Sequence, residues 1–103
     1  MVMPRMKANN EKQKWKEFGV WLVTYKYQLN NLMIEKAIIT YTYYFPTKAR
    51  HDADNYNGKF LNDFLTETKL LVDDDFLHIS TIINGGYDKN HPRVEIEINR
   101  LDL

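Results

Sequence analysis

The 103-residue chain contains no cysteine. This absence excludes a disulfide framework, a cysteine-ligated zinc site, an iron–sulfur cluster and a thiol nucleophile. No apolar run reaches the roughly 20 residues that a membrane-spanning helix needs, and residues 1–16 are too polar for a signal peptide. We therefore expect a cytoplasmic protein without a membrane partner.

The charge of the chain is balanced overall but not along its length. The 14 basic and 14 acidic side chains give a net charge of zero. Residues 1–50 carry nine Lys or Arg against three Glu, whereas residues 51–103 carry five Lys or Arg against eleven Asp or Glu. A basic half and an acidic half are expected when one surface meets phosphate and another holds cations. A well-mixed folded surface explains the same counts equally well.

The length and the apolar patterning predict one small domain. The polar residues 1–9 are expected to form a flexible N-terminal segment. From Asn10 onward, apolar residues fall at three- and four-residue steps, which predicts an amphipathic helix that Asn10 caps. The residues on its apolar face are Trp15, Phe18, Leu22, Tyr25 and Leu29.

Three later segments alternate in the way that strands do, namely residues 36–45, 77–83 and 94–98. A second helix is predicted over residues 55–66, with Asp54 as its cap. Residues 84–86, Asn-Gly-Gly, are expected to turn the chain. The resulting order predicts an α+β fold for residues 10–103, in which two main helices lie on one face of a mixed sheet of about three to four strands.

Acidic residues flank the second predicted helix, and they are Asp52, Asp54, Asp73, Asp74 and Asp75. The two groups meet if the chain after the helix returns along it through the apolar residues 70–72. Carboxylates about 4 Å apart repel by roughly 4 kcal/mol at an effective dielectric near 20, so a cation is needed to hold them together. Oxygen ligands favour Mg²⁺, with Mn²⁺ as substitute. Alternatively, Asp54 only caps the helix and residues 73–75 form a solvated turn.

Basic residues accompany the acidic groups. Lys59 either pairs with Asp63 on the helix surface or stabilises a departing oxyanion beside the carboxylates. Lys48, Arg50 and His51 follow the first predicted strand and are candidates for contacts with DNA phosphates. No two of the three histidines have the spacing of metal ligands.

The run Asp52-Ala53-Asp54-Asn55, followed by Lys59 and then by Asp73-Asp74, resembles the RusA-type Holliday junction resolvases. The similarity covers about residues 10–99. It implies a homodimeric, Mg²⁺-dependent endodeoxyribonuclease of DNA recombination and repair, found also in phages, that cuts four-way DNA junctions symmetrically without a small-molecule cofactor. The residue roles that it implies are metal binding by Asp52, Asp54 and Asp74, a neighbouring acid at Asp73, and an essential lysine at Lys59.

The chain departs from this pattern in three places. The opening strand of the family and its loop with proline and asparagine are not recognisable before Asn10. Lys59 stands one position later than the family spacing, and Gly58 occupies the usual position. Three consecutive aspartates leave open whether the functional pair is Asp73-Asp74 or Asp74-Asp75. A non-catalytic DNA-binding or phage-associated interaction module that retains the fold is therefore the alternative function.

Overall fold

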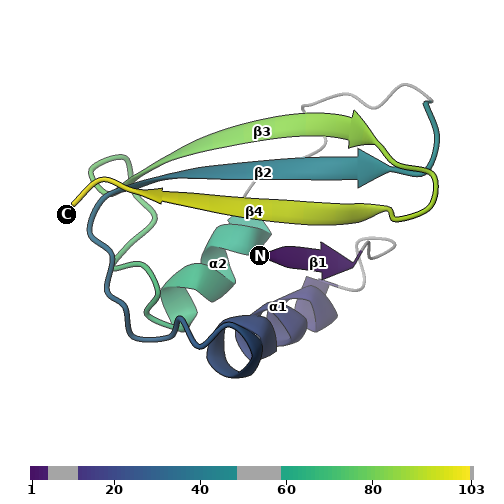
Figure 1. Cartoon of the computed structure of the whole chain (residues 1–103). Coiled ribbons are helices and arrows are strands. Elements are labelled where there is room, and N and C mark those ends of the chain that lie inside the picture. The colour runs from purple at the N-terminus through teal and green to yellow at the C-terminus, as the bar shows by residue number, and fades with distance from the viewer. Residues whose placement is uncertain (5–11, 49–58, 103) are drawn as a thin grey trace.

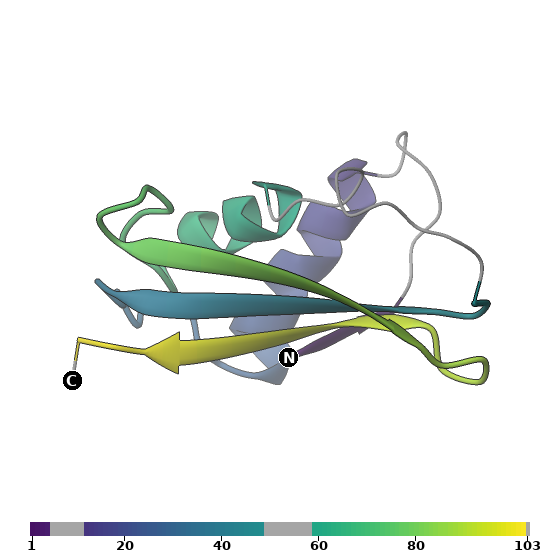
Figure 2. The same ribbon diagram turned by 90° about the horizontal axis from the view of Figure 1, so that it is seen from above.

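The structure is a computed structural model of the chain and describes residues 1–4, 12–48 and 59–102. Four strands form one sheet, and two helices lie on one face of it (Figure 1; Figure 2). The elements in chain order are β1 (Val2–Pro4), α1 (Lys12–Trp21), the π-helical segment η2 (Leu22–Lys26), β2 (Ala37–Phe45), α2 (Lys59–Glu67), β3 (Ile79–Tyr87) and β4 (Arg93–Arg100). The predicted α+β fold with a mixed sheet is confirmed.

The strands lie in the order β1-β4-β2-β3. β2 is parallel to β3, whereas β4 is antiparallel to both β2 and β1. Parallel neighbours need a crossover connection, and α2 lies in that crossover. As a result, residues 46–48 after β2 and residues 68–78 before β3 lie at opposite ends of these two strands.

The core lies between the sheet and the helices. Alternate residues of β2 point toward the helices, as the period of a strand requires, and they are the buried Ala37, Ile39 and Tyr41. The matching side chains of α2 are Leu61, Phe64 and Leu65, which are also buried. Burying a large apolar side chain stabilises the fold by about 1.5–3 kcal/mol, so this layer contact provides much of the stability.

The first helix differs from the prediction in its second half. The amide of Tyr27 donates to the carbonyl of Leu22 at 2.8 Å, five residues earlier, which is the pattern of a π-helix. This wider turn changes which residues face the core, so Val23 is fully buried whereas Tyr25 is 69% exposed. Placing Tyr25 on the buried face was therefore wrong. The predicted cap, Asn10, lies outside the described residues.

The beginning of the chain is tied to the sheet. The amino group of Met1 donates to the carbonyl of Ile96 at 2.8 Å, and the amide of Ile96 donates to the carbonyl of Met1 at 2.7 Å. Met3 is fully buried. Residues 1–4 thus differ from the flexible segment expected for residues 1–9, because they pair with β4 and bury the side chain of Met3. A strand of three residues is too short to show an alternating hydrophobic pattern in the sequence.

The predicted turn at residues 84–86 is wrong. β3 continues through Asn84, Gly85 and Gly86 to Tyr87, and each of these residues pairs with β2. A Cβ atom on Gly86 would lie 2.9 Å from the ring of Tyr44, so the glycine makes room for an aromatic ring across the strand. The glycine pair therefore serves side-chain packing on the sheet and not a reversal of the chain.

Candidate metal centre

Residues 68–78 connect α2 to β3 and carry the second predicted acidic group. After α2, Lys69 adopts a left-handed conformation with φ of 60°. The amide of Ile34 donates to the carbonyl of Leu70 at 2.9 Å, and the amide of Val72 donates to the carbonyl of Ile34 at 3.0 Å. The stretch predicted to return along α2 is thus held against the chain that precedes β2, which fixes the start of the acidic loop.

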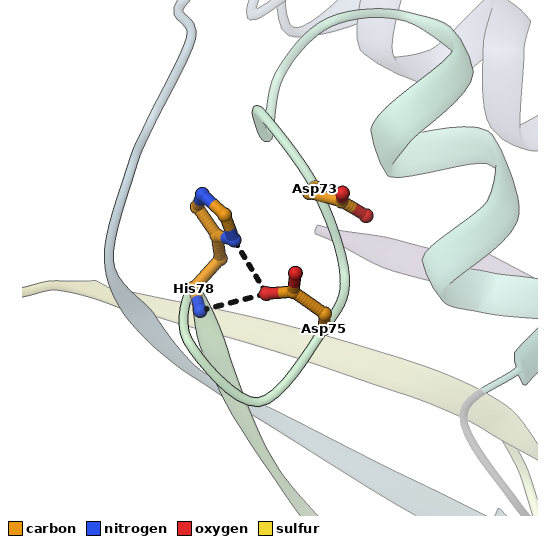
Figure 3. A group of neighbouring side chains, drawn as sticks. All are labelled: Asp73, Asp75 and His78. Carbon is orange, nitrogen blue, oxygen red and sulfur yellow. Dashed lines mark hydrogen bonds and ion pairs between the residues drawn. The ribbon is translucent and has the colours of Figure 1, made fainter.

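Asp75 organises the end of this loop. Its Oδ1 atom accepts the amides of Leu77 at 3.1 Å and His78 at 3.2 Å, and its carbonyl accepts the amides of His78 at 3.1 Å and Ile79 at 3.0 Å. Phe76 and Leu77 project from the tip of the loop and are exposed. These hydrogen bonds define where the Asp75 carboxylate points (Figure 3).

Asp75 and His78 form an ion pair. The Nδ1 atom of His78 lies 2.5 Å from Oδ1 of Asp75. The hydrogen bond to Asp75 raises the pKa of His78, and the same bond lowers the pKa of Asp75. When His78 is protonated, each charge favours the other, and the pair then competes with any cation that would bind these two residues.

Asp73, Asp75 and His78 together have the donor atoms of a cation site. One ligand atom from each residue lies within 4.8 Å of the others. Two carboxylate oxygens and an imidazole nitrogen suit Mn²⁺ or another transition ion better than Mg²⁺, which prefers oxygen. The sequence pattern did not point to His78, because no second histidine stands at a metal-ligand spacing from it. The feature that indicates its role is its position three residues after Asp75, which allows both side chains to meet in one turn.

A buried hydrogen bond joins β2 to α2. The hydroxyl of Tyr41 donates to Oδ1 of Asn62, and both residues are buried between β2 and α2. Burial raises the pKa of Tyr41, and the negative charges of Asp74 and Asp63 raise it further. Asp74 itself is exposed, and its amide donates to Oδ1 of Asp73 at 2.7 Å.

The other predicted site residues are only partly described. Arg50, His51, Asp52 and Asp54 lie outside the described residues. Lys59 begins α2, and its side chain is outside the described part as well. The convergence of the Asp52–Asp54 segment with Asp73 and Asp74 therefore remains a prediction.

Lys48 lies far from the described acidic loop. Its Nζ atom is 5.1 Å from the ring centroid of Tyr87, at the carboxyl end of β3, whereas Asp73 to Asp75 precede the amino end of the same strand. A strand of this length spans about 30 Å. Any DNA contact of Lys48 is thus separate from chemistry at Asp74.

Comparisons with known proteins give no family. No protein-family model matches the chain, and no curated protein matches it. The resemblance to the junction resolvases therefore rests on the motif residues alone. Within residues 1–4, 12–48 and 59–102, neither helix has the length and apolar character needed to cross a membrane.

Proposed function

We propose that this protein is a metal-dependent endodeoxyribonuclease of the RusA type, which resolves four-way DNA junctions by paired symmetric hydrolysis of phosphodiesters. The feature that carries the proposal is the arrangement of acidic residues about α2. The Asp52-Ala53-Asp54-Asn55 run leads into this helix, and Asp73 and Asp74 lie in the loop that follows it. The amides of Leu70 and Leu71 donate to the carbonyl of Leu65 at 3.1 and 3.2 Å, which turns the start of this loop back against the end of α2. In the proposed site, acids from both flanks of the helix share one ion.

The proposed roles follow from the chemistry of the side chains. Asp52, Asp54 and Asp74 would hold Mg²⁺ or Mn²⁺, and Asp73 is the neighbouring acid. When bound, the ion polarises a phosphate oxygen and lowers the pKa of the attacking water. Lys59, on the first turn of α2, would stabilise the departing oxyanion with its ammonium group.

The proposed partners are branched DNA and a second copy of the chain. Lys48, Arg50 and His51 would contact DNA phosphates, Lys48 at a distance from the cleaved bond, since the phosphate backbone dominates the affinity of proteins for DNA. A two-fold dimer would match the two equivalent strands of a four-way junction. Such a nuclease would act in the cytoplasm, where its substrate lies.

A non-catalytic DNA-binding or phage-associated interaction module is the second candidate. The displaced lysine favours it, because Gly58 stands where the family places the lysine. A one-residue shift rotates a helical side chain by about 100° when the helix is regular. Binding of junction DNA without cleavage, at saturating metal and with a steep dependence on salt, would support this alternative.

The test is cleavage of a labelled synthetic four-way junction in the presence of Mg²⁺ or Mn²⁺. We expect paired symmetric nicks from the purified protein and their loss in Asp74→Asn. Glu97→Gln is the matched control, because it also removes one negative charge but lies exposed on the other face of the sheet. Absence of nicks in the parent protein, or unchanged cleavage by Asp74→Asn, would reject the proposal.

A further inference from the structure

β3 forms an edge of the sheet. Among the described residues, only β2 pairs with it, through nine consecutive residue pairs without interruption. An edge strand presents a row of unpaired backbone groups to solvent, and proteins usually protect such a row with charged side chains, proline or a bulge. The question is whether β3 carries any of these protections.

The printed hydrogen bonds define which backbone groups of β3 are open. The amide of Ala37 donates to the carbonyl of His78, and the amide of Asp88 donates to the carbonyl of Phe45. Both bonds involve even-numbered residues, His78 and Asp88. Hydrogen bonds to one neighbour recur at every second residue of a parallel strand, so the backbone N–H and C=O groups of residues 80, 82, 84 and 86 bond to β2. The N–H and C=O groups of the alternate residues face the open edge, and these residues are Thr81, Ile83, Gly85 and Tyr87.

In the part of the chain that the structure describes, β3 has none of these three protections. Residues 79–87 contain no charged side chain and no proline. No described residue of positive φ falls within the strand, and its register with β2 is continuous, so no bulge twists it away. Thr81 and Gly85 are exposed although they lie on the side of the sheet that carries the helices, so neither helix covers this edge. The opposite edge, β1, is only three residues long and ends in proline.

We propose that β3 is the dimerisation edge, and that it pairs antiparallel with β3 of a second copy to join the two sheets into one. A second copy is the occupant that the charges favour. In a two-fold contact a strand lies against itself, so charged residues near the axis would meet residues of like sign. β3 has no such residues. In the proposed register, Ile83 lies opposite Ile83 of the second copy. Each residue whose backbone groups face the open edge then pairs with another such residue, and Thr81 lies opposite Gly85 of the second copy.

This pairing defines where the two candidate sites lie. Antiparallel neighbours in one continuous sheet are related by an axis perpendicular to the sheet, so the helices of both copies share one face. The two loops that carry Asp74 then lie at opposite ends of the shared seam, about 30 Å apart. Cleavage of both strands of one junction by this dimer rests on the proposed function, whereas the pairing itself does not.

The experiment is a mass measurement of the full chain, without DNA or metal, by light scattering over a range of concentrations. We expect twice the chain mass of 12.3 kDa for the parent protein. Thr81→Pro should reduce it to the mass of one chain, because it removes an amide that faces the open edge but no hydrogen bond to β2. Thr81→Val is the control, which keeps the amide and should remain dimeric.

Amide hydrogen exchange provides a second measurement that does not depend on a variant. In the dimer, the amides of Thr81, Ile83 and Gly85 should be protected together with those of residues 82 and 84. Dilution to the monomer should release only the first three. A monomer at all concentrations, or a dimer in which these three amides exchange freely, would overturn the proposal. A stable dimer without nuclease activity would contradict the proposed function alone.

Discussion

The hydroxyl of Tyr41 donates a hydrogen bond to the side-chain carbonyl of Asn62, across the buried interface between β2 and α2. The bond satisfies the polar ends of two side chains that are otherwise removed from water. It also sets the distance between the middle strand of the sheet and the first half of α2. Burial raises the pKa of this hydroxyl, and the negative charges of Asp74 and Asp63 raise it further.

Tyr41→Phe should destabilise the protein by about 1–3 kcal/mol, because it leaves the carbonyl oxygen of Asn62 buried without a donor. For a domain of this size, each kcal/mol lowers the melting temperature by about 4–8 °C. Thermal unfolding followed by circular dichroism checks the effect. Tyr25→Phe removes the same hydroxyl from an exposed ring and should leave the melting temperature unchanged. Equal melting temperatures for both variants would contradict the structural role of the bond.

The raised pKa of Tyr41 predicts a loss of stability at alkaline pH. The buried phenol keeps its proton in the folded state at pH values where the unfolded chain, with the ordinary pKa of 10.0, releases it. The resulting stabilisation is complete below the ordinary pKa and declines as the pH rises above it. We expect the melting temperature of Tyr41→Phe to fall less than that of the parent protein between about pH 9 and pH 11. If the melting temperatures of the two proteins fell equally with pH, this phenol would not ionise on unfolding.

Gly19→Ala should destabilise the packing of α1 on α2. A Cβ atom at Gly19 would lie 2.4 Å from the ring of Phe64, which is fully buried and has no room to withdraw. Overpacking costs about 1–3 kcal/mol and exceeds the gain of about 1 kcal/mol in helix propensity. Chemical denaturation measures the difference. The double variant Gly19→Ala with Phe64→Leu should recover part of the loss, and an equally unstable double variant would place the cause elsewhere.

The sequence predicts those elements whose own residues carry a clear period. β4 alternates apolar and charged side chains, and α2 places Leu61, Phe64 and Leu65 on one face, so both are recognisable without tertiary context. β3 is different, because Gly86 belongs to a strand only when the ring of Tyr44 lies across it. Tyr44 is distant from Gly86 in sequence, whereas the local Asn-Gly-Gly pattern favours a turn.

The candidate site was predictable by residue type but not by geometry. Three consecutive aspartates indicate an acidic cluster, but the sequence does not show which carboxylates point in the same direction. Asp73 and Asp75 gather with His78, and Asp74 is not part of this group. The direction of the Asp75 carboxylate depends on the amides of Leu77 and His78 that it accepts, and this turn of the backbone is not visible in the sequence pattern.

Asp88→Asn should weaken the turn between β3 and β4 in a pH-dependent way. Oδ2 of Asp88 accepts a hydrogen bond from Nη1 of Arg93 at 2.7 Å, and this bond lowers the pKa of Asp88 below its ordinary value of 3.8. The stabilisation is therefore present above pH 3.8 and is lost as the pH falls through the lowered pKa. We expect the melting temperature of Asp88→Asn to lie below that of the parent protein at pH 7 and to approach it in acid. A difference independent of pH would contradict the ion pair.

Metal-dependent thermal shifts separate the two acidic groups. A ligand that binds only the folded state stabilises it by about 2.7 kcal/mol at a hundred times its dissociation constant. Mn²⁺ or Mg²⁺ at about 1 mM should therefore raise the melting temperature of the parent protein by roughly 10–20 °C if its dissociation constant is about 10 μM. If the ion is held by Asp52, Asp54 and Asp74, Asp74→Asn should abolish this shift, whereas Asp75→Asn should retain most of it.

The opposite result has an equally clear meaning. Loss of the shift in Asp75→Asn and in His78→Ala, with a normal shift in Asp74→Asn, would assign the ion to the group that is gathered in the loop before β3. Glu97→Gln, which removes an exposed charge on the other face of the sheet, controls for the general effect of net charge. Because the pair between Asp75 and His78 must open before a cation can enter, binding at that group would also strengthen as the pH rises and His78 loses its proton.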